Sequence, residues 1–130
     1  LLTGDSRYAD RAAAIPQAFA GDIARSAPGH SGLLANAMDV ISPQQVVVVG
    51  AAQGTHALAQ VMRTVSLPGA LQQVIDAGAT MPATPALAGK TAQAGLATAY
   101  VCVGPQCSAP ITDALLLAQT LRAQRAAASA

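Results

Sequence analysis

The two cysteines of this chain, Cys102 and Cys107, are the residues whose type and spacing most directly suggest chemistry. Four residues separate them, which differs from the C-x-x-C spacing of thioredoxin-type redox centres. The intervening Gly104 and Pro105 favour a turn, so the two Cα atoms could come within the roughly 7 Å that a disulfide requires. Because buried cysteines often serve as small apolar residues, we expect structural thiols, with a redox-active or disulfide-forming pair as the alternative.

A zinc site is a weaker interpretation of the same cysteines, because zinc needs about four ligands. His30 and His56 are the only histidines, and neither is close in sequence to the cysteines or to the other. We therefore predict no metal and no cofactor. The sequence also lacks a nucleophile elbow and a close pair of carboxylates, so we do not expect this chain alone to be an enzyme.

A second candidate site follows the apolar run QQVVVVG. Gly50 lies in the turn that leads into a predicted helix, and Gly54, Thr55 and His56 lie in the first turn of that helix. Free amides at a helix start favour phosphate, so this stretch could form a small nucleotide- or phosphate-binding unit. It lacks the third glycine of a dinucleotide-binding turn and the lysine of a P-loop, and glycine suits any such turn. His56 is a candidate general base at this edge of the sheet, although a solvated histidine is the simpler interpretation.

The composition indicates a surface that something else covers. Of the 130 residues, 52% are hydrophobic and only 10% are charged, whereas about 25% charged residues is usual. Such a sparsely charged surface leads us to expect contact with the rest of a longer chain or with a second copy of this one. The net charge of +1, without a cluster of Lys or Arg, disfavours nucleic-acid binding. We find no membrane-spanning run and no signal-peptide pattern, and we expect a cytoplasmic protein.

Two helices are predicted before Pro43. The first occupies residues 4–26, with Asp5 or Ser6 as its cap and with Pro16 expected to kink the helix or to start it afresh. Its apolar stripe consists of Tyr8, Ala12, Ile15, Phe19 and Ile23. The second helix occupies residues 31–42, with Ser31 as its cap. Two helices joined by a short turn form a helical hairpin.

An α/β unit is predicted after Pro43. Strands are expected over 44–50, 70–78 and 97–103, helices over 54–66 and 112–128, and a long loop over 79–95. Thr112 is the predicted cap of the last helix. Because strand, helix and strand at this spacing imply a right-handed parallel crossover, we predict a small three-layer unit. Its sheet should be short, three-stranded and mainly parallel, with the first strand central and helices on both faces.

The segment LAGKTAQAGLATAYVCVGPQCSAPITDALLLAQTL resembles the carboxyl-terminal end of the YyaL-type, spermatogenesis-associated thioredoxin-domain-containing protein family. The shared pattern is a Gly-Lys pair, a strand that ends in Ala-Tyr-Val-Cys, a second Cys, and then Ala-Pro and Thr-Asp before the last helix. The matching residues are Gly89, Lys90, Thr98, Ala99, Tyr100, Val101, Cys102, Cys107, Ala109, Pro110, Thr112 and Asp113. The alanine-rich stretch before Lys90 departs from the more charged and aromatic loop that the resemblance would imply.

The resemblance implies a long parent protein with an amino-terminal thioredoxin-like domain, an α/α-toroid of helical hairpins, and this tail. Residues 1–42 would then be the last hairpin of the toroid, and residues 43–130 the carboxyl-terminal α/β domain. The implied role is a non-catalytic structural or interaction domain, whose partner is the remainder of the parent chain or a second copy. A thiol-redox element at Cys102 and Cys107, and a phosphate-binding module at Gly50–Thr55, remain the alternatives.

Overall fold

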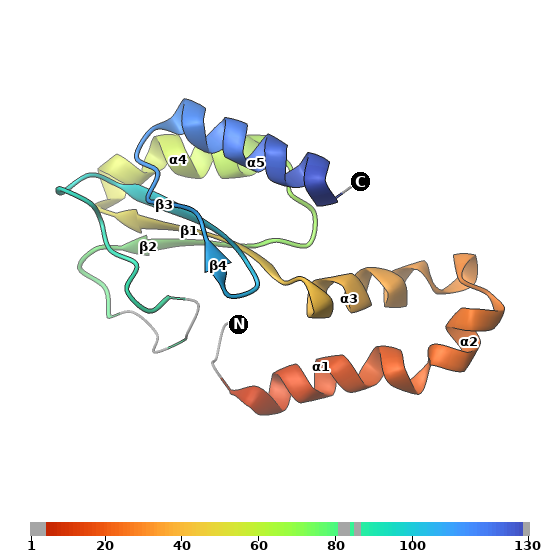
Figure 1. Cartoon of the computed structure of the whole chain (residues 1–130). Coiled ribbons are helices and arrows are strands. Elements are labelled where there is room, and N and C mark those ends of the chain that lie inside the picture. The colour runs from red at the N-terminus through yellow and green to blue at the C-terminus, as the bar shows by residue number, and fades with distance from the viewer. Residues whose placement is uncertain (1–4, 81–83, 85–86, 129–130) are drawn as a thin grey trace.

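A helical hairpin leads directly into a mixed sheet in the computed structural model of this chain (Figure 1). The structure describes residues 5–80, 84 and 87–128. Residues 1–4 of the predicted hairpin, and residues 81–83 and 85–86 of the predicted loop, therefore lie outside the described residues.

The hairpin consists of α1 (Ser6–Ala18), α2 (Ala20–Arg25), the 3₁₀ turn η1 (Pro28–His30) and α3 (Ser31–Ile41). As predicted, Asp5 caps α1, because its carboxylate accepts a hydrogen bond from the backbone N–H of Arg7 at 3.0 Å. The helix continues through Pro16 and is interrupted only at Phe19. The cap predicted at Ser31 is wrong, because η1 already carries helical backbone up to that residue.

The sheet contains β1 (Gln44–Gly50), β2 (Leu71–Asp76), β3 (Thr98–Val103) and β4 (Gln106–Cys107), in the order β2-β1-β3-β4. α4 (Ala52–Thr64) connects β1 to β2, and these two strands are parallel, as the strand–helix–strand pattern predicts. β1 lies between β2 and β3, so the prediction of a central first strand is confirmed.

The prediction of a mainly parallel three-stranded sheet is wrong. β3 runs antiparallel to β1, and β4 is a fourth strand antiparallel to β3. In the register, Val49 pairs with Ile75 near the end of β2 and with Thr98 at the start of β3. The connection between β2 and β3 therefore begins and ends at the same edge of the sheet. A parallel third strand would have needed a crossover that returned the chain to the opposite edge.

Both helices of the α/β unit cover the same face of the sheet (Figure 1). α4 and α5 (Ala114–Ala128) bury their apolar sides against alternate residues of β1 and β3. The buried residues of this cluster are Val46, Val48, Leu58, Ala59, Met62, Val65, Leu67, Ala99, Val101, Ile111, Leu117, Ala118 and Leu121. On the opposite face, Val47 and Val49 pack against Leu87 from the connection between β2 and β3. In the described part of this connection the chain forms turns and loop and no helix, so the third layer of helix predicted for this face is not found among the described residues.

The start of α5 also differs from the prediction. The carboxylate of Asp113 accepts a hydrogen bond from the backbone N–H of Leu116 at 2.7 Å, so Asp113 caps this helix in place of Thr112. Upstream of the cap, Ile111 exchanges two backbone hydrogen bonds with Ala99 of β3, at 2.7 and 3.0 Å. These bonds fix the point at which the chain leaves the sheet and enters α5.

Candidate functional site

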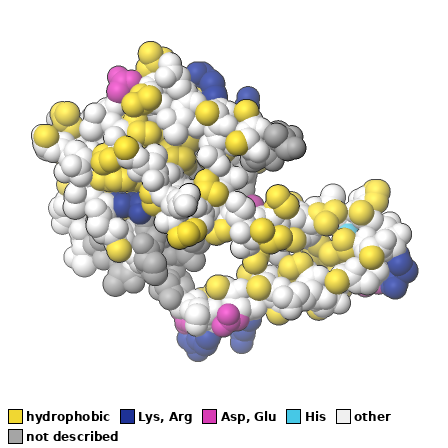
Figure 2. Space-filling view, viewed as in Figure 1, with side chains coloured by type: hydrophobic (Ala, Val, Ile, Leu, Met, Phe, Trp, Pro, Cys, Tyr) yellow, Lys and Arg dark blue, Asp and Glu magenta, His cyan; other side chains and the backbone are white. Residues whose placement is uncertain are grey.

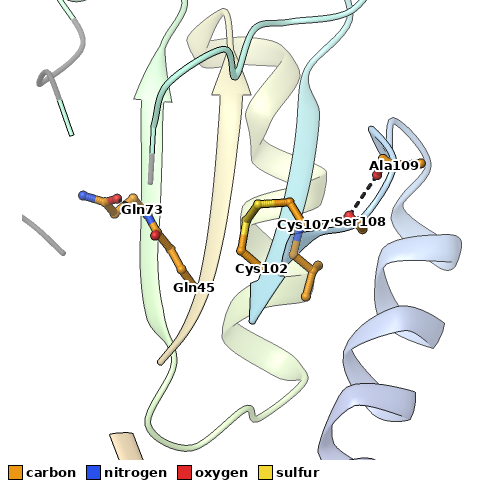
Figure 3. Close-up of a disulfide and its surroundings, with 7 residues drawn as sticks. Gln45, Gln73, Cys102, Cys107, Ser108 and Ala109 are labelled. Carbon is orange, nitrogen blue, oxygen red and sulfur yellow. Dashed lines mark hydrogen bonds between the residues drawn. A yellow bond between two sulfur atoms is a disulfide. The ribbon is translucent and has the colours of Figure 1, made fainter. Parts of the chain in front are cut away.

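Cys102 and Cys107 form a disulfide that joins β3 to β4 (Figure 3). The two residues are directly opposite in the antiparallel register, and their Cα atoms are 3.9 Å apart. The tight turn between them depends on Gly104, whose φ of +53° lies in the left-handed region. The expectation of two free structural thiols is therefore wrong, and the disulfide-forming alternative describes this structure.

The two cysteines differ strongly in their exposure. Cys102 is 4% exposed, because it lies within β3, between β1 and β4, on the face away from α4 and α5. Cys107 is exposed, because it lies on β4, a two-residue strand at the edge of the sheet. Sequence reasoning recognised the pair but not this asymmetry, because a two-residue strand has no periodicity to detect.

A row of polar side chains extends from the disulfide across the sheet. Gln45 of β1 is opposite Cys102 and is 3% exposed. Its Nε2 donates a hydrogen bond to Oε1 of Gln73 in β2 at 2.9 Å (Figure 3). The row Gln73–Gln45–Cys102–Cys107 thus crosses all four strands. Sequence reasoning missed both glutamines, although a glutamine in an otherwise apolar buried strand signals a polar partner on the neighbouring strand.

The chain after Cys107 is attached to β3 by bonds that do not involve sulfur. The backbone N–H of Ser108 donates to the carbonyl of Val101 at 2.8 Å, and the Ser108 hydroxyl accepts from the Val101 N–H at 3.1 Å. Cys102 pairs with Cys107, but Ala99 pairs with Ile111, so the second strand contains one extra residue, a β-bulge. Pro110 falls in this bulge, where its missing N–H costs no ladder bond.

Lys90, in the loop before β3, is buried, with 7% of the residue exposed. Its Nζ lies 5.8 Å from the centroid of the Tyr100 ring, within the range of a cation–π contact. Among the described residues no carboxylate forms an ion pair with this ammonium. Within the described residues, the Tyr100 ring of β3 is the group that lies against this ammonium.

The second candidate site lies at the other end of β1, so the structure does not bring it together with the cysteines. A Cβ added to Gly50 would lie 2.7 Å from Cα of Ala97, which shows that the backbone before β3 packs closely on this glycine. The Thr55 hydroxyl donates to the carbonyl of Ala52 at 3.0 Å, and Thr55 is buried, whereas His56 is exposed. Gly54 lies in the first turn of α4. Ligand binding at these four residues stays a prediction.

The part of the chain that the structure describes has neither a metal-binding cluster nor a membrane-spanning helix. No group of three or more His, Cys, Asp and Glu side chains in it is arranged to hold a metal ion. No helix in it combines the length and the apolar character that crossing a membrane requires.

Comparisons with known proteins give no family assignment: no family model, no curated protein and no solved structure matches the chain.

Proposed function

We propose that this chain is a non-catalytic structural and interaction domain of a larger protein, of the kind that the family resemblance implies. In that arrangement the hairpin packs against a toroid of similar hairpins, and the α/β unit supports it. The observation that carries the proposal is the exposed apolar surface of the hairpin.

None of the described residues of α1, α2 and α3 is buried, although α1 and α3 pack against each other. The exposed fraction is 62% for Tyr8, 60% for Met38 and 77% for Ile41. Figure 2 shows hydrophobic side chains gathered over the hairpin. Two helices that cover only each other leave much of their apolar surface in water. A further layer is therefore needed to complete this part of the fold.

The free energy available from such a layer is large on the scale of domain stability. Full burial of one large apolar side chain contributes about 1.5–3 kcal/mol, and the hairpin exposes several of them. We infer that the remainder of the parent chain supplies the covering surface, and that a second copy is the other possible source.

The experiment compares the chain with the double variant Met38→Glu/Ile41→Glu, which makes α3 polar on its exposed side. Leu115→Glu/Leu116→Glu is the matched control, because these residues are the exposed leucines of α5, 67% and 49% exposed. The isolated chain should bind a hydrophobic dye or self-associate. The α3 variant should lose at least half of the dye binding or self-association of the parent chain, and the α5 variant should lose little of it.

Two outcomes decide between the possibilities. A stable dimer that dissociates in the α3 variant would identify a second copy as the covering partner. A monomer with a sharp thermal transition and no dye binding would remove the basis of the proposal.

A further inference from the structure

We propose that the Cys102–Cys107 disulfide is a site of reversible thiol–disulfide exchange, at which an external thiolate attacks Sγ of Cys107. This proposal is independent of the docking role of the hairpin, because the disulfide lies on the sheet and the two can be tested separately. It assigns a direction to the chemistry: Cys107 is the attacked sulfur, and Cys102 is the leaving group.

The direction follows from access along the bond between the two sulfurs. A thiolate must approach the attacked sulfur from the side opposite the leaving sulfur, and only an accessible sulfur reacts. Cys107 lies on the edge strand and is exposed, so its outer side faces away from the sheet. The corresponding side of Cys102 faces β1, where the buried Gln45 is its register partner. Attack at Cys102 would therefore require the side chain of Gln45 to move aside.

The exchange balances without a metal or a cofactor. An external thiolate RS⁻ forms an R–S–Sγ bond to Cys107 while the Sγ–Sγ bond breaks, and Cys102 leaves as a thiolate that takes a proton from water. A second thiolate attacks the R sulfur of this mixed disulfide and releases R–S–S–R and the Cys107 thiolate. Two external thiols are thereby oxidised to one disulfide while the protein disulfide is reduced to two thiols. The partner is defined by its chemistry as a thiol.

The hydrogen bonds around the disulfide do not involve sulfur, so they support a reversible exchange. Ser108 is bonded to Val101 and Ile111 to Ala99, and we expect these bonds to persist after reduction. The N–H of Gly104 also donates to the carbonyl of Pro43 at 2.8 Å, which holds the turn before β4 against the start of β1. The two thiols therefore stay close, and re-formation of the bond is an intramolecular step.

The loop that the disulfide closes is short, because the cysteines are separated by 5 positions in sequence. A short loop loses less chain entropy than a long one when it is cross-linked, so we expect this bond to contribute at the low end of the usual range for disulfides. The reduced chain should accordingly keep its fold. This property separates an exchange site from a disulfide that serves only to stabilise the structure.

The first experiment equilibrates the intact chain with buffers that span reduced to oxidised glutathione, and then alkylates free thiols for mass spectrometry. We expect two alkylated cysteines at the reducing end, a re-formed disulfide at the oxidising end, and the same circular-dichroism spectrum throughout. A parallel series with dithiothreitol tests whether a dithiol reacts faster than glutathione. A disulfide that resists reduction at every ratio, or a spectrum that collapses on reduction, would overturn the proposal.

The second experiment tests the direction with Cys102→Ser and Cys107→Ser, each treated with oxidised glutathione. Cys107, left alone in the first variant, should form the mixed disulfide at least about tenfold faster than Cys102 does in the second. The double variant, which has no thiol, is the control. Equal or reversed rates would contradict the assignment.

Should either variant fail to fold, the wild-type chain still decides the direction. Brief treatment with reduced glutathione, followed by acid quenching and peptide mapping, should locate the adduct on Cys107. An adduct found mainly on Cys102 would refute the proposed direction.

Discussion

The ammonium of Lys90 lies 5.8 Å from the centroid of the Tyr100 ring, and both side chains are buried. The same tyrosine also binds the chain next to Lys90 through its hydroxyl, which donates to the carbonyl of Thr91 at 2.8 Å and accepts from Nε2 of Gln93 at 3.1 Å. One residue of β3 thus holds residues 90–93 by its ring and by its hydroxyl together.

Tyr100→Phe should lower the free energy of unfolding by about 1 kcal/mol, because it removes the hydroxyl bonds and keeps the ring beside Lys90. Tyr100→Leu should lower the free energy of unfolding by about 1–2 kcal/mol more than Tyr100→Phe, because it also removes the cation–π contact and the aromatic packing. Urea denaturation of both variants measures the contribution of the hydroxyl and that of the ring separately. Equal stability of the two variants would show that the ring contributes nothing to holding Lys90.

Leu117 and Leu116 are neighbours in α5 with opposite environments. Leu117 is fully buried in the cluster between the helices and the sheet, whereas Leu116 is 49% exposed. Leu117→Ala should therefore cost about 3–4 kcal/mol in unfolding free energy, while Leu116→Ala should stay within about 0.5 kcal/mol of the parent chain. Thermal or urea denaturation of the two variants measures this difference. A larger loss of stability in Leu116→Ala than in Leu117→Ala would mean that α5 packs through its other side.

Gly50 and Gly54 provide a matched pair at the turn from β1 into α4. In Gly50→Ala the new Cβ would meet the backbone of Ala97 at 2.7 Å, so we expect a loss of about 1–3 kcal/mol. In Gly54→Ala the nearest atom is Cβ of Ala97 at 3.5 Å, an ordinary contact, and alanine favours the helix by up to about 1 kcal/mol. In urea denaturation, we expect Gly50→Ala to lower the free energy of unfolding and Gly54→Ala to raise it. A neutral Gly50→Ala would show that the Ala97 segment moves aside easily.

The same close contact bears on phosphate binding at Gly50–Thr55. Because Ala97 packs against Gly50 and the Thr55 hydroxyl is already bonded to Ala52, we expect inorganic phosphate and nucleotides to leave the melting temperature unchanged within about 1 °C. A screen by thermal shift, with sodium chloride at matched ionic strength as the control, measures this. A concentration-dependent rise with one nucleotide would instead establish the binding site.

At the start of α1, the Arg7 guanidinium lowers the pKa of the Asp5 carboxyl, and the Arg7 backbone N–H adds to this effect. A carboxyl whose pKa is lowered by folding stabilises the folded form above its ordinary pKa. This contribution is lost as the pH falls through the lowered value. An NMR titration of Asp5 should therefore give a pKa below the ordinary 3.8, and Arg7→Gln should raise it. A pKa at or above the ordinary value in the parent chain would contradict the observed pairing.

The sequence allowed the local elements and the parallel β1–β2 pair to be predicted, because these depend on short patterns. The β-branched run Val46–Val49 reads as a buried strand, and it is one. The direction of β3 was missed, although the loop predicted before it already lacked the helix that a parallel return needs.

The disulfide and the buried Lys90 depend on how the sheet assembles, which short sequence patterns do not specify. Whether Cys107 continues a hairpin depends on the turn at Gly104 and on two residues of strand, which is too short for any periodicity. Lysine is rarely buried, so the residue type at position 90 gives no indication of burial. The buried Lys90 lies against Tyr100, which is on the face of the sheet opposite α4 and α5, and this neighbourhood is a property of the assembled sheet.

The two partners of β1 also imply an order of assembly. Val48 pairs with Val74 on one side and with Ala99 on the other, so the second pairing closes a loop about twice as long. Chain closure over a longer separation costs more entropy and slows folding. The β1–α4–β2 segment can therefore form an early nucleus, onto which β3, β4 and α5 add later.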